Sequence, residues 1–599
     1  MRVNISELNG ECLGAFFETC RFTGLKPSPE GVVLRAEKRL EPGVCVRRSE
    51  EGILIRYSEL SLFCRALGRL EEEWEETPDF GTRAVMLDMS RNGVMTPEAA
   101  EDFARSAALL GFNRIQFYLE DIYEVPEEPY FGALRGRYTP EEISRIEEVS
   151  HRLGLELMPC IQTLAHFNAP FKWWRYAERI VDCEDILLMD SEESDLFLRH
   201  LISSIARIFS SRNIHVGMDE AFRMCCGKYR ALHGRQDPAK VFFRHLEKVC
   251  ALCQEFGLKP AIWSDMAYES AQGERVELPK NLALVYWEYS CTEEEKYFEI
   301  LNRHRMLFAN EVRFAGCALT HAGVVPDNGN AFRTAPPAVA ACRRAGVRDV
   351  TVTMWGDDGQ ECSRWAAIPS LVLWAQLLCG GETEESVLTL RAARSFGAEW
   401  KNFSAIDKIW RFRKGEPFNT AAKYLLYNDP LLGIFDSLAG DGSYAKHYRR
   451  TASELAAIVA RGGRYSKLFN TYAALCRALE MKCDLGVRLK NCYDAGNRVG
   501  LEALRTELPE LLDRLRAYRD AHYLQWTEEN KIFGFETIDL RIGGLCRRIQ
   551  TLGERLNGYL SGALAELPEL KEARLDFTGH GVPNTSMPTY QYMPTPGVL

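Results

Sequence analysis

The stretch "RAVMLDMSRNGVMTPEAAEDFARSAALLGFNRIQFYLE", residues 83–120, holds the pattern that decides the fold. An apolar run of strand length at 83–90 is followed by an amphipathic segment and then by a second apolar run at 113–120. The segment between them has the signals of a helix, because a Thr-Pro pair at 96–97 opens it and Gly111 closes it. This stretch therefore predicts a strand, a helix and a second strand.

The same alternation continues along the chain. Strands that are apolar throughout are typical of a parallel sheet covered on both faces. Eight β-α units over about 300 residues favour a TIM barrel, whereas a doubly wound α/β sheet would carry a Gly-rich phosphate loop after its first strand. The segment "LDMSRNGVM" is not such a loop. Six further runs of strand length complete the predicted (β/α)8 barrel: 155–162, 214–221, 259–266, 282–290, 305–312 and 349–358.

The barrel is expected to be one of four units. In the first unit, two strands at 31–40 and 52–59 precede a helix at 60–76. After about residue 385 the strand pattern ends and long amphipathic segments follow. The chain ends in a segment rich in proline and polar residues, which either covers a neighbouring subunit or lies loose. The predicted units are a small α/β domain (1–78), the catalytic barrel (79–385), an α-helical domain (386–572) and an extended C-terminal arm (573–599).

Composition limits the classes of partner. The formal net charge is −10 and no basic block offsets it, which argues against nucleic acid and against an anionic membrane surface. No apolar run approaches the roughly 18 residues needed to span a bilayer, and the N-terminus lacks the pattern of a secretory signal. Nineteen scattered cysteines indicate reduced thiols. We therefore expect a cytoplasmic protein, and we expect no metal. The helical domain and the C-terminal arm are compatible with a homodimer.

Acidic and aromatic residues gather at the predicted carboxyl ends of the strands, where a TIM barrel carries its active site. Tryptophan recurs beside acids at the fifth, sixth and eighth strands, although ordinary barrel packing is an alternative reason for it. Aromatic faces pack on the apolar face of a sugar and carboxylates accept hydrogen bonds from its hydroxyls, so this pattern predicts a carbohydrate site. The residues at these ends are Asp88, Arg91, Glu120, Asp121, Asp219, Glu220, Trp263, Asp265, Trp287, Glu288, Glu311, Trp355, Asp357 and Asp358.

Asp219 and Glu220 are neighbours at the end of the fourth predicted strand. Strand alternation would send them to opposite faces, so both reach one site only where the backbone turns. Two ionised carboxylates in one cleft repel, and one of them tends to keep a proton. Neighbours cannot easily straddle a glycosidic bond as the carboxylates of most glycosidases do. The pair therefore suggests a general acid beside a carboxylate that directs a nucleophile of the substrate, such as a 2-acetamido oxygen.

The motifs "RAVMLDMSR" (83–91) and "IHVGMDEA" (214–221) resemble those of family 20 glycoside hydrolases, the β-N-acetylhexosaminidases. The resemblance covers about residues 1–385 and only weakly the helical tail. It implies exo-acting, retaining removal of terminal N-acetylglucosamine or N-acetylgalactosamine from an oligosaccharide or glycoconjugate. It also implies catalysis through an oxazolinium intermediate and no cofactor.

The resemblance also implies roles for individual residues. Glu220 would be the acid and then the base, and Asp219 would hold the acetamido N–H. The family's tyrosine for the acetamido carbonyl has no match after the seventh strand, and Tyr289 is the expected substitute. His166 and His215, which the resemblance places near the acid, could instead be buried core residues. The other implied substrate-binding residues are Arg83 at the outer hydroxyls, Trp263, Trp287 and Trp355 at the walls, Asp357 at the hydroxyls of positions 4 and 6, and His166 and His215 near the acid.

Two other readings remain open at this point. A non-enzymatic glycan-binding protein would keep the tryptophans but would need no acid at position 220. Another TIM-barrel glycosidase is possible, although the D-x-x-D-x-D-x-E pattern of family 18 is not found. Metal-dependent hydrolysis would need a histidine cluster at a strand end, which the sequence lacks.

Overall fold

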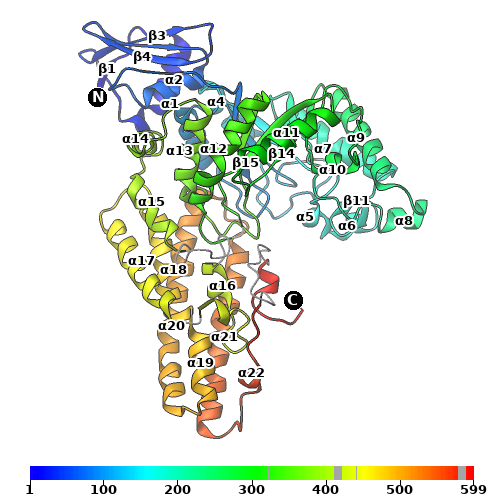
Figure 1. Cartoon of the computed structure of the whole chain (residues 1–599), viewed down its shortest axis with the longest axis vertical. Coiled ribbons are helices and arrows are strands. Elements are labelled where there is room, and N and C mark those ends of the chain that lie inside the picture. The colour runs from blue at the N-terminus through cyan, green and yellow to red at the C-terminus, as the bar shows by residue number, and fades with distance from the viewer. Residues whose placement is uncertain (322, 410–420, 440–441, 578–588, 599) are drawn as a thin grey trace.

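The computed structural model describes residues 1–321, 323–409, 421–439, 442–577 and 589–598. It has a small α/β domain at the N-terminus, a barrel, and a bundle of long helices that extends away from the barrel (Figure 1). The barrel strands are all parallel and follow each other in chain order around a closed ring, so the predicted TIM barrel is confirmed. They are β7 (Thr82–Asp88), β8 (Arg114–Tyr118), β9 (Glu156–Cys160), β12 (Asn213–His215), β13 (Lys259–Trp263), β14 (Ala283–Trp287), β15 (Glu311–Cys317) and β16 (Asp349–Met354).

Two of the helices between the strands show clear start signals in the structure. Helix α3 (Pro97–Leu110) begins after Thr96, whose side chain accepts the N–H of Ala99, and it ends at the left-handed Gly111. Helix α4 (Pro140–Arg152) begins in a capping box. The other elements of the barrel region are α5 (Asn168–Phe171), α6 (Trp174–Ala177), β10 (Val181–Cys183), β11 (Ile186–Leu187), α7 (Glu192–Ile208), α8 (Lys228–His233), α9 (Pro238–Glu255), α10 (Asp265–Ser270), α11 (Glu294–Leu307), α12 (Asn328–Ala345), η1 (Arg364–Ala367) and α13 (Ile368–Leu378).

The seventh barrel strand lies later in the chain than predicted. Helix α11 continues to Leu307, and β15 begins only at Glu311, so the prediction of a strand over 305–312 is wrong. The first residues of that run extend the amphipathic helix, whereas the apolar residues that follow Glu311 enter the barrel. Glu311 therefore lies at the amino end of its strand, where it pairs with Arg313. It is on the opposite side of the barrel from the predicted site.

The N-terminal domain is a six-stranded mixed sheet in the order β2-β1-β3-β5-β4-β6, with two helices. The predicted helix over 60–76 ends at Leu67, and its last residues instead form an edge strand paired antiparallel with β4. Glu76 of that strand is buried, and its charge is compensated by Arg65 and Arg391. The elements are β1 (Arg2–Asn4), α1 (Gly10–Thr23), β2 (Lys26–Pro27), β3 (Val32–Lys38), β4 (Val44–Ser49), β5 (Gly52–Tyr57), α2 (Leu60–Leu67) and β6 (Trp74–Glu76).

The helical bundle packs against the barrel. Part of the predicted arm, 578–588 and 599, lies outside the described residues, but Tyr590 contacts the chain's own Asp358. In the part of the chain that the structure describes, no helix is both long and apolar enough to cross a membrane. The bundle contains α14 (Glu385–Phe396), α15 (Trp400–Asp407), α16 (Ala421–Tyr427), η2 (Asp436–Ala439), α17 (Ser443–Ala460), α18 (Ser466–Lys482), α19 (Leu485–Asp494), α20 (Arg498–Glu529), α21 (Phe535–Ser561), α22 (Pro568–Lys571) and η3 (Tyr590–Tyr592).

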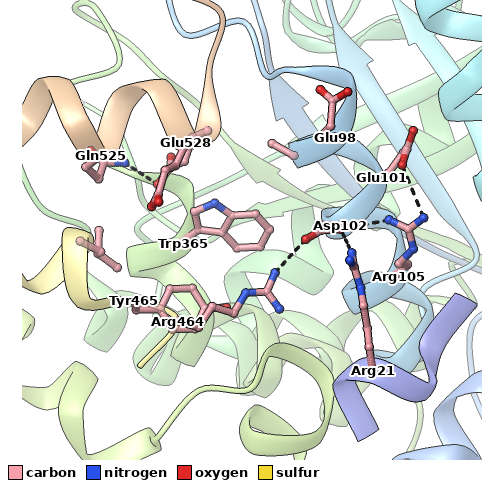
Figure 2. A pocket seen from close by; sticks show the side chains of 13 residues that line it. Arg21, Glu98, Glu101, Asp102, Arg105, Trp365, Arg464, Tyr465, Gln525 and Glu528 are labelled. Atoms are coloured by element: carbon pink, nitrogen blue, oxygen red, sulfur yellow. Dashed lines mark hydrogen bonds and ion pairs between the residues drawn. The ribbon is translucent and has the colours of Figure 1, made fainter. Parts of the chain in front are cut away.

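A cavity of about 460 Å³ lies where the three parts of the chain meet (Figure 2). Asp102 of α3 lines it and pairs with Arg21 of α1, Arg105 of α3 and Arg464, which precedes α18. Its charged side chains are thus used to join the N-terminal domain, the barrel and the helical bundle. This cavity is separate from the carboxyl ends of the barrel strands, where the predicted site lies.

Candidate active site

A second cavity, of about 250 Å³, opens at the carboxyl ends of the barrel strands. It brings together eight of the ten residues that the sequence predicted for the site. Arg83 and His215 are the two that do not line it. The lining residues are Arg91, His166, Asp219, Glu220, Trp263, Trp287, Tyr289, His321, Trp355 and Asp357.

The backbone after β12 explains how two neighbouring carboxylates reach one cavity. Gly217, Met218 and Glu220 have φ values of 70°, 72° and 52°, in the left-handed region. Position 217 requires glycine for a second reason, because a Cβ there would lie 1.9 Å from Oε1 of Gln162. This turn replaces the alternation of a strand, so Asp219 and Glu220 line the same cavity.

Asp219 is held in its ionised form. Gln162 Nε2 donates a hydrogen bond to its Oδ1 at 2.8 Å, and His166 Nε2 lies 3.1 Å from its Oδ2. Burial opposes ionisation, but the charge and hydrogen bond of His166, helped by Gln162, lower the pKa of Asp219 to about 2. Burial also opposes the charge of His166, yet Asp219 raises the pKa of this histidine to about 9. The two residues therefore form an ion pair at neutral pH.

Glu220 has the opposite tendency. Burial and the neighbouring charge of Asp219 raise the pKa of Glu220 above its usual value, although its side chain is still 48% exposed. Its backbone N–H donates to Oδ2 of Asp265 at 2.9 Å. The pKa of Asp265 is raised to about 7 by burial and by Asp219. The pKa of Asp219 is lowered and that of Glu220 is raised, which is the pattern of a general acid beside a charged partner.

His166, Asp219 and Glu220 are also the residue types that bind metal ions, and their ligand atoms lie within 4.8 Å of one another. A metal-binding histidine must be neutral. His166 is instead kept protonated by Asp219, as its raised pKa indicates. A metal ion at this position would therefore have to displace the proton of the His166–Asp219 ion pair.

Aromatic side chains form the walls of the cavity. The ring of Trp355 lies 5.8 Å from that of Trp263, and its indole N–H donates to the hydroxyl of Tyr289 at 2.9 Å. The rings of Trp287 and Tyr289 are 5.3 Å apart. Burial raises the pKa of Tyr289 well above its usual value, so its hydroxyl stays protonated. The result is a small apolar enclosure with a hydroxyl at one wall.

Arg91 and Asp357 also line the cavity, and Arg91 reaches three carboxylates. Its Nη1 is 3.3 Å from Oε1 of Glu120 and 3.4 Å from Oδ2 of Asp88, and its Nε is 3.9 Å from Oδ1 of Asp357. Its guanidinium lies over the ring of Trp355, 5.5 Å from the centroid. Asp88 and Glu120 therefore anchor a guanidinium that stays next to the cavity together with the partly exposed Asp357.

The structure corrects the prediction for Arg83. This residue is at the amino end of β7, where its Nε donates to the carbonyl of Gly111 at 2.9 Å and its guanidinium pairs with Glu59. Because the site lies at the carboxyl end of the strand, Arg83 joins the barrel to the N-terminal domain and cannot contact a substrate. Arg91, from the loop after the same strand, is the arginine of the cavity.

His215 does not line the cavity either. It is buried behind Trp263, with the ring centroids 4.3 Å apart, and its Nδ1 accepts the N–H of Gly217 at 3.1 Å. Burial lowers the pKa of His215 to about 3, so it is neutral. His215 supports the cavity wall at Trp263 and the turn at Gly217. For this histidine the alternative of a buried core residue therefore applies.

Sequence reasoning placed Arg91 at a strand end but gave it no role in the site, and it missed His321 as a cavity residue and Gln162 as the partner of Asp219. Arg91 could have been given the role assigned to Arg83, because it follows the carboxyl end of the first strand by three residues. His321 follows the seventh strand, whose position was predicted too early in the chain. Gln162 carries no local signal, since its role depends on the turn after the neighbouring barrel strand, β12.

Solved structures with the same fold include family 20 enzymes. The exo-β-N-acetylglucosaminidase of Vibrio harveyi superposes with a TM-score of 0.51 and 16% identity, covering 68% of this chain and 74% of its own. The chitobiase of Flavobacterium johnsoniae superposes with a TM-score of 0.52 and 13% identity, covering 84% and 92%. At these identities the likeness shows the fold.

Sequence comparisons identify relatives and a family. Hexosaminidase D of Bos taurus is 27% identical over 223 residues, which span 35% of this chain and 63% of that protein. Hexosaminidase D of Homo sapiens is 25% identical over 227 residues, 46% of its length. The model of the glycosyl hydrolase family 20 catalytic domain matches residues 80–309, and that of the glycoside hydrolase 20C C-terminal domain matches 399–588. With two of its family models matched in order along the sequence, the chain belongs to glycoside hydrolase family 20.

Proposed function

We propose that this protein is an exo-acting, retaining β-N-acetylhexosaminidase that uses the acetamido group of its substrate as the nucleophile. The observation that carries the proposal is the turn after β12, which places an ionised Asp219 and a Glu220 with a raised pKa in one cavity. The family and its hexosaminidase relatives support the same activity. The cavity has room for about one sugar ring, as removal of a terminal residue requires.

In the first step, the acetamido carbonyl oxygen attacks C1 while the bond from C1 to the leaving oxygen breaks. Glu220 gives its proton to that oxygen, for which its raised pKa suits it. The carboxylate of Asp219 accepts the acetamido N–H and offsets the positive charge of the cyclic oxazolinium. A group with a pKa near 2 remains ionised throughout this step.

In the second step, Glu220 is the base. It removes a proton from a water molecule, whose oxygen attacks C1 from the side that the leaving group vacated. The bond from C1 to the acetamido oxygen breaks, the acetamide is restored, and Glu220 regains its proton. Two displacements at C1 give overall retention of configuration.

The rest of the cavity suits the other parts of an N-acetylhexosamine. Trp263, Trp287 and Trp355 offer apolar surface to the acetamido methyl and to the face of the ring. The protonated hydroxyl of Tyr289 is a donor for the acetamido carbonyl. Arg91, in place of Arg83, and Asp357 provide a cation and an anion for the outer hydroxyls.

A panel of aryl glycosides tests the proposal. The p-nitrophenyl N-acetyl-β-glucosaminide, the corresponding galactosaminide or both should be hydrolysed, whereas the plain β-glucoside should show at least about 10²-fold lower kcat/KM because it lacks the internal nucleophile. Release of nitrophenol measures the rate. Equal hydrolysis of the glucoside would contradict the mechanism, and binding of N-acetylglucosamine without hydrolysis would indicate a glycan-binding protein.

The pH profile should depend on His166. Activity requires an ionised Asp219 and a protonated Glu220, so it lies between the lowered pKa of the first and the raised pKa of the second. The positive charge of His166 lowers both pKa values. In His166→Gln both limbs of kcat/KM should therefore move to higher pH.

The measurement is kcat/KM for the aryl substrate from about pH 3 to about pH 10 by a stopped assay. His151→Gln is the matched control, because His151 is an exposed histidine of α4 outside the cavity. An unchanged profile in His166→Gln, or a movement to lower pH, would contradict the assignment of these two carboxylates.

We also propose that the substrates are oligosaccharides or glycoconjugates of a reducing compartment such as the cytoplasm. All nineteen cysteines are free thiols, most of them buried, which supports such a compartment. Mass spectrometry of alkylated thiols from freshly broken cells would test this, since an oxidising compartment would leave exposed cysteines protected from alkylation.

A further inference from the structure

The loop that carries Asp357 is held from outside the barrel. Residues 355–361 follow β16 and include three consecutive residues with left-handed φ: Asp358 at 59°, Gly359 at 101° and Gln360 at 57°. Non-glycine residues adopt this conformation at a cost, and they remain there only where the surroundings hold them. The last barrel strand ends at Met354, so the loop needs partners beyond the strand to hold this conformation.

Those partners come from the helical bundle. Lys423 of α16 donates to Oδ2 of Asp358 at 2.6 Å, and Arg541 of α21 donates to Oδ1 at 2.9 Å and to the backbone carbonyl of the same residue at 2.7 Å. The backbone N–H of Tyr590 donates to Oδ2 at 2.9 Å. Both carboxylate oxygens and the backbone carbonyl of Asp358 therefore accept hydrogen bonds from residues that follow the barrel in sequence.

Glu361 repeats the arrangement at the other end of the loop. Its Oε2 lies 2.6 Å from Lys423 and its Oε1 lies 3.1 Å from Arg541, while the hydroxyl of Tyr427 donates to Oε1 at 2.5 Å. Lys423 and Arg541 are 1% and 8% exposed. Two cations and two carboxylates thus form a buried cluster, and removal of either cation would leave a carboxylate uncompensated.

The bundle also contacts the loop that carries Arg91. Asn92 donates to the hydroxyl of Thr537 in α21 at 3.1 Å. The N–H of Lys531, between α20 and α21, donates to the carbonyl of Val94 at 2.7 Å. Arg91 and Asp357 both line the cavity, and each lies in a loop that the bundle holds.

We propose that the helical bundle positions Asp357 for the outer hydroxyls of the terminal sugar, through the cluster of Lys423 and Arg541 with Asp358 and Glu361. The proposal rests on the proposed function for the identity of the ligand. Lys423 and Arg541 are positioning residues, because they contact the loop and do not line the cavity. Loss of the cluster should weaken recognition of the sugar more than it slows the bond-breaking steps at Asp219 and Glu220.

Arg541→Gln and Arg541→Lys test this in the full-length protein. In Arg541→Gln, KM for the aryl N-acetylhexosaminide should rise about tenfold, the effect of one lost charged hydrogen bond, while kcat changes less than about threefold. The lysine variant should recover part of the loss. Asp357→Ala should raise KM similarly, and the double variant should be no worse than the single ones, because both act on one contact.

Arg548→Gln is the matched control. Arg548 is also in α21 and pairs with a buried carboxylate, Asp429, but both residues lie within the bundle. It should lose thermal stability without a change in KM. Equal changes of KM in Arg541→Gln and Arg548→Gln, or none in either, would overturn the proposal.

A crystal structure of Arg541→Gln separates this proposal from the proposed function. We expect residues 355–361 to be displaced while the barrel strands superpose on those of the unaltered protein. Asp358→Asn, which keeps the shape of the side chain, is the second variant if Arg541→Gln does not fold. An undisplaced loop overturns the positioning role whatever the activity. An unaltered protein that hydrolyses none of the aryl substrates overturns the proposed function alone.

Discussion

Replacing Glu220 by glutamine is expected to remove most turnover while leaving the binding of N-acetylglucosamine nearly unchanged. Glutamine keeps the size and polarity of the side chain but has no proton to give to the leaving oxygen. For a phenyl N-acetyl-β-glucosaminide, kcat should therefore fall by about 10²–10⁴-fold, the usual contribution of a general acid. A 2,4-dinitrophenyl leaving group needs little protonation, so its loss should be clearly smaller.

The dependence on the leaving group is the decisive measurement for Glu220. Steady-state kinetics with a series of aryl leaving groups would give a steeper dependence of kcat/KM on phenol acidity in the variant than in the unaltered protein. Glu288→Gln is the control, because Glu288 also follows a barrel strand but accepts hydrogen bonds from Ser290 within its own turn. The same loss for every leaving group would mean that Glu220 is not the acid.

Much of the barrel could be predicted because its signals are local. The Thr-Pro start and the glycine end of α3 are properties of a few neighbouring residues, and they determine the helix bounds directly. The seventh strand was predicted too early because no such local signal separates it from the helix before it. The apolar residues at the end of α11 and at the start of β15 are separated by only three residues, Phe308–Asn310, without a proline or glycine between them.

The two arginines near β7 show where a motif needs the fold to be interpreted. Arg83 and Arg91 both belong to the stretch that resembles family 20, but the seven residues of β7 separate the two ends of the barrel by about 20 Å. Only a residue beyond the carboxyl end can reach the cavity. The direction of the strand was already implied by the predicted barrel, so Arg91 could have been chosen from the sequence.

The contacts that depend on distant parts of the chain could not have been predicted. Gln162 supports Asp219 from a different strand end, and its role follows from a turn with three left-handed residues that no strand pattern indicates. Lys423 and Arg541 reach Asp358 across 65 and 183 residues of sequence. Their residue types are common on helix surfaces, so only the packing of the bundle distinguishes them.

Asp219→Asn should produce the second large effect, for a different physical reason. Asparagine has the same shape but no charge, so it can no longer offset the positive charge that develops on the oxazolinium. We expect kcat for the aryl N-acetylhexosaminide to fall by about 10²–10³-fold, as for the loss of a group that stabilises charge in the transition state. The loss should be similar for good and poor leaving groups, unlike that of Glu220→Gln, because the charge on the ring forms with either.

Binding measurements can isolate this charge effect from protonation. A stable cationic mimic of the bicyclic intermediate should lose far more affinity in Asp219→Asn than the neutral product N-acetylglucosamine, and calorimetry would compare the two. Asp121→Asn is the control, because Asp121 is a buried acid at the end of a barrel strand that pairs with Arg135 outside the cavity. Equal loss of affinity for the neutral and the cationic ligand would show that Asp219 shapes the cavity without stabilising charge. The nucleophile would then have to be sought outside the substrate, and the ion pair with His166 would need another explanation.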